Sequence, residues 1–226
     1  MERPRYDVWI DRGGTFTDCL VRDRVAQSIR IAKVLSGEED VPRALRQILG
    51  LSSETPLPSC HLRLGTTIGT NALLERRGAP TVLVVSEGFR DLLIIGDQTR
   101  PDLFELAIRQ SDPLVPVVSV PSRGGPGGMV DRATDDQIAT ILEPCLAAGA
   151  VSCAVCLLFG HRCPELEEQV EEVARQLGFR HVELSHQVSV ETGYLGRAQT
   201  TTINAYLTPL LRAYLRGLEG ELAEGT

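Results

Sequence analysis

The chain has 226 residues, of which 42% are hydrophobic and 4% aromatic, enough for one large α/β domain or two small ones with an aliphatic core. Its net charge of −7 argues against a nucleic-acid partner or an anionic membrane surface, because both repel an acidic protein. The sequence shows no apolar leader and no apolar run long enough to span a bilayer, so we expect a cytoplasmic protein.

The first part of the chain alternates between strand and helix patterns. In order, these are strands at 6–11, 16–23 and 27–35, a helix at 41–50, a strand at 61–67, a helix at 68–78 and a strand at 80–86. Short turns join the first three strands, which predicts an antiparallel meander. The continuous apolar run at 80–86 is typical of a strand buried on both faces of a partly parallel sheet.

The second part follows a turn-rich stretch at 101–130, so we divide the chain into 1–100, 101–130 and 131–226. The segment "GGPGG" in this stretch predicts a surface hairpin, because a phosphate loop would need a Lys-Ser/Thr pair and a helix after it. Later patterns predict a helix at 134–149 capped by Thr134, a strand at 150–159, a helix at 164–178 opened by Pro164, a strand at 181–189 and a helix at 200–222. This order implies right-handed parallel crossovers.

Cys153 and Cys156 form a C-x-x-C pair with His161 and Cys163 nearby, a spacing that could serve a zinc site. On a strand, however, residues three apart point to opposite faces, so the two sulfurs would not converge on one ion. We therefore interpret these cysteines as small buried hydrophobic residues, in the reduced state.

The segment "DRGGTFTD" places glycines and threonines between Asp11 and Asp18, directly after a strand. The glycines would let backbone N–H groups approach phosphate oxygens, and Thr15 adds a hydroxyl donor. Asp11 would hold a magnesium ion through water, because that ion dehydrates reluctantly, with Arg12 or Thr17 assisting. The alternative is a tight hairpin whose aspartate caps its own turn.

A second segment, "GTTIGTNALLERRG" at 65–78, places threonines at the end of a strand and Asn71 in the first turns of a helix. Helix N-termini attract anions, so Thr66, Thr67, Thr70 and Asn71 would supply neutral donors beside a phosphate or substrate. Ordinary N-capping by threonine is the alternative. Together the two segments indicate a nucleotide-phosphate or acyl-phosphate site.

These segments, with "EGFRDLLIIGDQTRPDLFEL" and "TTINAYLTPLL", occur in the order seen in the hydantoinase A and 5-oxoprolinase family, which the chain resembles over nearly its whole length. The resemblance implies an α/β, actin-like (ribonuclease H-like) lobe, in which an N-terminal antiparallel meander joins parallel strands and flanking helices. It also implies an ATP-dependent hydrolase of cyclic amides. The lactam or imide oxygen is phosphorylated, so that water can open the ring. Related members are subunits of ATP-dependent ketone carboxylases.

The resemblance assigns roles to individual residues. It implies catalytic roles for Asp11, Thr67 and Asn71, and metal contacts for Asp11 and Asp18. The residues that it places at ATP are Asp11, Gly13, Gly14, Thr15, Thr17, Thr66 and Thr67. The cofactors would be ATP and Mg²⁺, and the partner a hydantoinase B-type subunit.

A further family segment contains Phe89, Arg90, Asp91 and Gly96. There we expect Arg90 to pair with Asp91 or to reach an anionic group, and a surface salt bridge is an equal alternative. Before the last helix the sequence departs from the family pattern, although Arg197 keeps the position of its arginine.

The chain is also shorter than we expect for such an enzyme, since no second Asp/Gly phosphate loop follows Arg197. We therefore interpret it as the N-terminal lobe, with the second nucleotide-binding lobe absent and the fragment alone inactive. The alternative is a stand-alone remnant that acts as a binding or scaffold domain. A sugar or acid kinase fits less well, because those families lack the "GTTIGTNALLER" element.

The last helix carries an apolar stripe of Ile203, Leu207, Leu210, Leu211, Tyr214 and Leu218. Part of this stripe would cover the lobe's own sheet. We expect the rest to mediate self-association, most simply as a two-fold dimer; the alternative is a helix whose apolar stripe is buried entirely in its own core.

Overall fold

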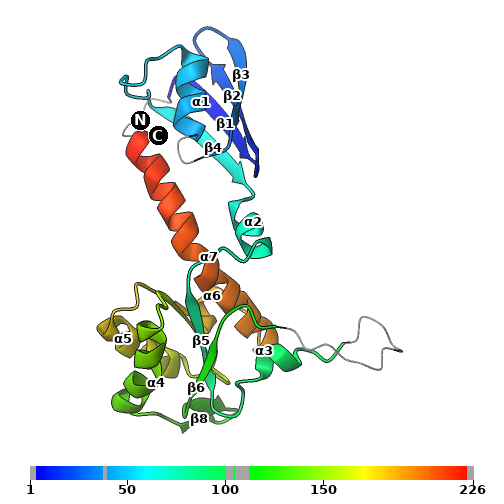
Figure 1. Ribbon diagram of the computed structural model, residues 1–226, viewed down its shortest axis with the longest axis vertical. Coiled ribbons are helices and arrows are strands. Elements are labelled where there is room, and N and C mark those ends of the chain that lie inside the picture. The colour runs from blue at the N-terminus through cyan, green and yellow to red at the C-terminus, as the bar shows by residue number, and fades with distance from the viewer. Residues whose placement is uncertain (1–3, 38–39, 100–103, 105–111, 223–226) are drawn as a thin grey trace. The chain divides into compact units, whose positions relative to one another are not determined.

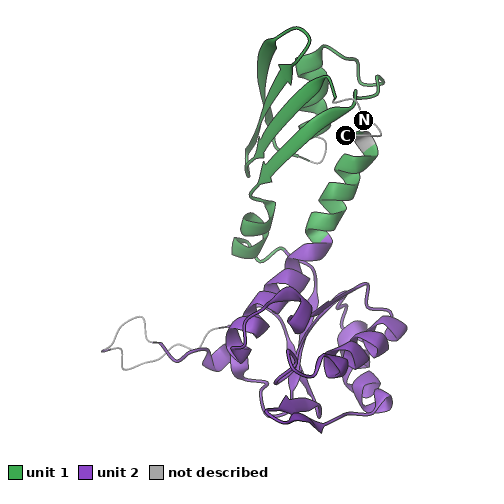
Figure 2. Cartoon of the chain, turned by 180° about the vertical axis from the view of Figure 1, so that it is seen from behind, with its two compact units in different colours: residues 1–77, 210–226 green, residues 78–209 purple. Residues whose placement is uncertain are grey.

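The computed structural model describes residues 4–37, 40–99, 104 and 112–222. The chain divides into two compact units (Figure 2): residues 1–77 with 210–226 form the first unit, and residues 78–209 form the second. These units do not coincide with the segments 1–100 and 131–226 expected from the sequence. The boundary lies after residue 77 because the strand at Thr81–Ser86 pairs with strands of the second unit. In addition, helix α7 (Tyr194–Glu221) begins in the second unit and ends in the first.

The first unit is built on a four-stranded sheet in the order β3-β2-β1-β4 (Figure 1). Its strands are β1 (Tyr6–Arg12), β2 (Phe16–Asp23), β3 (Ser28–Leu35) and β4 (Cys60–Thr66). β1, β2 and β3 form the predicted antiparallel meander, and β4 lies parallel to β1. A parallel neighbour needs a crossover connection, which helix α1 (Asp40–Leu49) supplies. The expected meander joined to a parallel strand is confirmed.

One face of this sheet forms the core of the first unit. Its buried side chains include Val8, Ile10, Cys19 and Val21 of the sheet, Ala44 and Leu45 of α1, and Leu218 of α7. Leu218 of the predicted apolar stripe therefore serves the unit's own core. On the opposite face Trp9, Phe16, Ile29, Ile31 and Leu35 are exposed. Among the described residues, no helix is long and apolar enough to cross a membrane.

A buried carboxylate stabilises the end of β2. Asp23 accepts hydrogen bonds from Arg5 Nε at 3.0 Å and from the backbone N–H groups of Val25 at 2.9 Å and Ala26 at 3.0 Å. The hydrogen bond from Arg5, helped by that from Ala26, holds the pKa of Asp23 well below its ordinary value. A carboxylate with a lowered folded-state pKa stabilises the fold above its unfolded pKa and loses this contribution as the pH falls through the folded value.

We therefore predict that Asp23→Asn flattens the acid loss of stability in the first unit. In urea unfolding followed by Trp9 fluorescence, the midpoint of the parent chain should fall steeply from about pH 4 downward, and that of the variant less steeply. Asp131→Asn, which removes an exposed carboxylate of the second unit, is the control and should keep the parent's slope. Equal slopes for Asp23→Asn and the parent would contradict the prediction.

The second unit contains a parallel four-stranded sheet in the order β10-β9-β5-β6. Its elements are β5 (Thr81–Ser86), α3 (Leu92–Ile95), β6 (Val117–Val120), α4 (Asp135–Ala147), β9 (Ser152–Cys156), α5 (Pro164–Leu177), β10 (His181–Leu184) and α6 (Ser185–Val188). The predicted strand and helix alternation is confirmed. Thr134 caps α4 in a capping box with Gln137, and Pro164 opens α5, as expected.

Two predictions in this unit met different outcomes. The "GGPGG" segment forms a hairpin, β7 (Arg123–Gly125) with β8 (Gly128–Asp131), as predicted. The strand predicted at 181–189 is too long: β10 ends at Leu184 and α6 follows. The strand ends there because Ser185 and the backbone N–H of His186 hydrogen-bond to Glu167 instead of continuing a ladder. Most of residues 101–111 lie outside the described residues.

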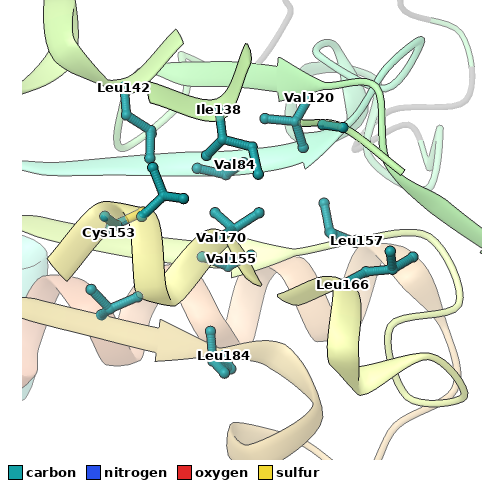
Figure 3. Close-up of a cluster of buried hydrophobic side chains, with 14 of the residues drawn as sticks. Val84, Val120, Ile138, Leu142, Cys153, Val155, Leu157, Leu166, Val170 and Leu184 are labelled. Atoms are coloured by element: carbon teal, nitrogen blue, oxygen red, sulfur yellow. The ribbon is translucent and has the colours of Figure 1, made fainter. Parts of the chain in front are cut away.

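The core of the second unit lies between the sheet and the helices α4 and α5. Figure 3 shows Val84 of β5 and Val155 of β9 beside Ile138 of α4 and Val170 of α5. Cys153 and Cys156 are both fully buried in β9, in agreement with the interpretation as small hydrophobic residues. Burial raises the pKa of the Cys156 thiol to about 11, so this sulfur stays protonated at neutral pH.

Candidate functional site

The turn between β1 and β2 carries the first predicted motif, and its glycines lie where side chains would be crowded. Gly13 donates its N–H to Phe16 O at 2.9 Å, and a Cβ on Gly13 would stand 3.1 Å from that same oxygen. A Cβ on Gly14 would stand 3.0 Å from Asn71 Nδ2. Glycine therefore allows this turn to close on itself and to approach Asn71.

The second motif lies at the start of α2 (Ile68–Leu74), in the same unit. Thr67 donates its backbone N–H to Arg12 O at 3.1 Å, which joins the beginning of α2 to the end of β1. Asn71 Nδ2 donates to Thr67 Oγ1 at 3.3 Å, and Thr66 Oγ1 accepts from the N–H of Ile68 at 3.2 Å. The structure thus brings Thr67 and Asn71 to the glycine turn.

The helix itself is shorter than predicted. It ends at Leu74, whereas the sequence pattern predicts an end at Gly78. The backbone N–H groups of Arg76 and Arg77 bond back to the last turn, and Arg76 takes a positive φ of 53°. Gly78 has a different role, close contact with the Tyr206 ring.

Asp11 and Asp18 are direct partners in the β1–β2 register, and Gly65 of β4 lies beside Asp11 on its other side. Since direct partners share one face of a sheet, both carboxylates lie on the face opposite the core. They help to line a shallow depression of about 280 Å³ on that face. Asp11 is exposed, whereas Asp18 Oδ2 accepts from Lys33 Nζ at 3.0 Å.

This arrangement fits a magnesium ion that is bound largely by phosphate and water. Within the part of the chain that the structure describes, no group of three or more His, Cys, Asp or Glu residues could hold a metal by itself. Magnesium sites usually need only one or two carboxylates, completed by substrate phosphates and water. Asp11 meets this requirement as it stands, whereas Asp18 would first have to leave Lys33.

Thr17 does not join the other predicted phosphate ligands. It is fully buried on the core face of the sheet, and its Oγ1 lies 3.0 Å from Ser36 Oγ. Its position therefore gives no support to a direct contact with phosphate. The sequence interpretation also missed Ser36, although extending the β2–β3 register one step beyond the Phe16–Leu35 pair places Ser36 opposite Thr15.

Arg12 is likewise directed away from the outer face. It donates from Nη2 to Gly37 O at 3.0 Å, and its guanidinium carbon lies 4.8 Å from the centroid of the Tyr214 ring. These contacts connect the end of β1 to the segment after β3 and to the last part of α7. Arg12 thus supports the turn from the core side.

Comparison with known proteins identifies the family. The sequence model of the family described as "Hydantoinase/oxoprolinase N-terminal region" matches residues 7–178, which include both motifs. The chain belongs to this family. A 5-oxoprolinase of Saccharomyces cerevisiae is 31% identical over 268 aligned residues, covering 99% of this chain and 21% of the relative. The acetophenone carboxylase gamma subunit of Aromatoleum aromaticum is 30% identical, with 88% of this chain and 30% of the relative covered.

The chain shares its fold with part of an ATP-dependent enzyme of known structure. The ATP-dependent caprolactamase from Pseudomonas jessenii superposes with a TM-score of 0.77 at 24% identity, covering 95% of this chain and 33% of that chain. The expected α/β lobe, with its antiparallel meander and parallel strands, therefore has the same fold as this enzyme. The chain spans about a fifth of the length of the 5-oxoprolinase that it matches.

The family segment around Phe89 lies in the second unit. Arg90 and Asp91 are both exposed, and no ion pair joins them in the described structure, so the predicted pair is not formed. Phe89 packs edge-on against Tyr194, with ring centroids 5.1 Å apart. Gly96 ends α3 with a positive φ of 58°, a conformation that favours glycine.

Arg197 belongs to a buried polar network that sequence analysis missed. Arg197 donates from Nε to Ser185 Oγ at 2.8 Å and from Nη2 to Leu157 O at 2.6 Å, and only 1% of its surface is exposed. Glu167 is fully buried and accepts from the same Ser185 hydroxyl at 2.6 Å. A signal existed: Glu167 lies on the apolar stripe of its helix, three positions before Val170.

Proposed function

We propose that the chain is the N-terminal part of an ATP-dependent hydrolase that acts on a small cyclic amide, as 5-oxoprolinases do. The enzyme would phosphorylate the lactam or imide oxygen, which makes the carbonyl carbon open to attack by water. One observation carries the proposal: the glycine turn approaches Asn71 so closely that a Gly14 Cβ would stand 3.0 Å from its amide, beside an exposed Asp11. The similarity to a 5-oxoprolinase supports the choice of reaction.

In this proposal the turn and the start of α2 bind the phosphates of ATP. The N–H of Gly14 and the hydroxyl of Thr15 donate to phosphate oxygens, while Gly13 contributes by lacking a side chain, since its own N–H bonds to Phe16 O. Thr66, Thr67 and Asn71 supply neutral donors at the transferred phosphate or the substrate oxygen. Asp11 would hold Mg²⁺ through water. The bound ion supplies positive charge that offsets the charge developing on the phosphate.

A second candidate function is a subunit of an ATP-dependent ketone carboxylase, where phosphorylation activates an enol. The acetophenone carboxylase gamma subunit favours it, because that protein is 30% identical to this chain over 88% of its length, against 31% over 99% for the 5-oxoprolinase of Saccharomyces cerevisiae. Both candidates use the same phosphate site and differ in the group that accepts the phosphate.

We also propose a hydantoinase B-type subunit as partner, a cytoplasmic location, and self-association through the part of the α7 stripe outside the first unit's core. A stand-alone scaffold would not need Asp11.

The site is tested by titrating residues 1–226 with Mg·ATP while recording backbone amide NMR signals. We expect changes centred on Gly14, Thr15 and Thr67, with a millimolar dissociation constant that corresponds to about −4 kcal/mol. Asp11→Asn should weaken this binding about 5-fold when Mg²⁺ is present and much less with ATP alone, because its carboxylate acts through the ion.

The control variant is Glu75→Gln, which removes an exposed carboxylate just beyond α2 in the same unit. It should bind Mg·ATP as the parent does. Signal changes spread evenly over the surface, or an equal loss of affinity in both variants, would mean that the acidic surface as a whole binds the ion. A parent chain without any change at these amides would support the scaffold instead.

A further inference from the structure

Ser36, the residue after β3, contacts the glycine turn at two points. Its hydroxyl donates to Gly13 O at 2.9 Å, and its backbone N–H donates to Thr15 O at 3.0 Å. The Thr17 hydroxyl lies 3.0 Å from Ser36 Oγ. Because the Ser36 proton is directed to Gly13 O, Thr17 is the donor in this last bond. Ser36 is thus hydrogen-bonded to both ends of the turn and to the strand that follows it.

The bond to Gly13 O has a consequence for the next amide group. The described chain contains no cis peptide bond, and in a trans peptide the C=O and the following N–H point in opposite directions. With Gly13 O held by Ser36, the N–H of Gly14 must point away from Ser36. A freely rotating peptide plane between two glycines would otherwise populate both orientations, since glycine restricts its neighbouring dihedrals least.

We propose that Ser36 is a positioning residue for the phosphate-binding turn: its hydroxyl holds the Gly13–Gly14 peptide plane so that the Gly14 N–H is presented to a nucleotide phosphate. This inference rests on the proposed function for the ligand, whereas the orientation of the turn rests on the hydrogen bonds alone. Preorganised donors bind an anion better than donors that must first be oriented, because no ordering cost is incurred on binding.

The test compares three variants of residues 1–226. Ser36→Ala removes the hydroxyl, and Ser36→Thr keeps it. Ser28→Ala is the matched control, because Ser28 lies at the other end of the same strand and its buried hydroxyl has no hydrogen-bond partner among the described residues. Amide hydrogen exchange of the Gly13 N–H, which bonds across the turn to Phe16 O, is measured without nucleotide. Mg·ATP affinity is then measured from the amide NMR signals.

Ser36→Ala should speed exchange at Gly13 and weaken Mg·ATP binding, each about 5-fold, as expected for one lost hydrogen bond. Ser36→Thr should restore both values, and Ser28→Ala should change neither. Unchanged exchange in Ser36→Ala would overturn the positioning of the turn. Faster exchange with unchanged affinity would show a purely structural role and overturn the proposal as well.

The proposed function and the positioning role of Ser36 are tested by different measurements. If the parent chain shows no response to Mg·ATP at the turn, the proposed function is wrong, and so is the presentation of the Gly14 N–H to a nucleotide. The exchange rates, which need no ligand, would still decide whether Ser36 holds the turn.

Discussion

Glu167→Ala should destabilise the second unit by about 4 kcal/mol or more, a large part of the 5–15 kcal/mol that holds a typical domain folded. Glu167 is fully buried. Its Oε1 accepts from Leu157 N at 2.9 Å and from the Ser185 hydroxyl at 2.6 Å, and its Oε2 accepts from His186 N at 3.1 Å. Alanine would leave these donors buried without an acceptor, at a cost of about 1–3 kcal/mol each.

The same change also affects the imidazole of His186. Its Nδ1 lies 2.8 Å from Glu167 Oε2, and this hydrogen bond raises the pKa of His186 above its ordinary value. Without Glu167 the ring would lose both its partner and the neighbouring charge. Of the hydrogen bonds described above, those of Arg197 to Ser185 and Leu157 O would remain.

Urea unfolding followed by far-UV circular dichroism measures the effect. Glu172→Ala is the matched control, since Glu172 lies on the same helix and is exposed. It should shift the unfolding midpoint only slightly, because surface substitutions usually change stability by less than about 0.5 kcal/mol. Equal midpoints for Glu167→Ala and Glu172→Ala would show that the network contributes little to folding.

Gly78→Ala is the second substitution with a large expected effect, a loss of about 3 kcal/mol. A Cβ at Gly78 would stand 2.2 Å from both Cδ1 and Cε1 of the Tyr206 ring. Tyr206 is 6% exposed, and its carbonyl accepts from the N–H of Ala79 at 2.9 Å, so neither the ring nor its backbone can move away easily. The added methyl group would force a rearrangement at the start of the second unit.

A double-mutant cycle isolates this contact. Tyr206→Ala is destabilising by itself, because it leaves a cavity. In that background Gly78→Ala should cost less than about 0.5 kcal/mol, since the ring that it meets is gone. Gly193→Ala serves as control, because a Cβ there would meet nothing within 4 Å. Additive effects of the two substitutions in the cycle would contradict the contact.

Some of the site could be predicted from sequence because short segments encode it. The glycines of "DRGGTFTD" and the polar residues after β4 lie in turns whose composition alone indicates close backbone approach. The alternation of apolar residues then predicts the face of the meander on which each side chain lies. The structure adds that Asp11 pairs with Asp18. Thr17 is the exception: the same alternation turns it to the core face, which a motif comparison does not take into account.

What sequence reasoning could not reach are contacts between residues far apart in the chain. The strand predicted at 181–189 stops at Leu184 because a carboxylate on α5 competes for its backbone. The helix predicted to end at Gly78 ends at Leu74. Gly78 instead leaves room for the ring of Tyr206, a residue far away in the sequence. Neither early end could be predicted from the neighbouring residues, because their helix and strand propensities favour the longer elements.

The sequence by itself determined most of the elements and their order, the glycine turn, the caps of α4 and α5, and the burial of Cys153 and Cys156, because each depends on neighbours within a few residues. Only the tertiary structure decided that Asn71 meets Gly14, that Ser36 holds Gly13 O and that Glu167 joins α5 to α6. A polar side chain inside a fold takes whichever partner the packed elements bring within hydrogen-bond distance. Leaving it unpaired is costly, so these partners are set by packing.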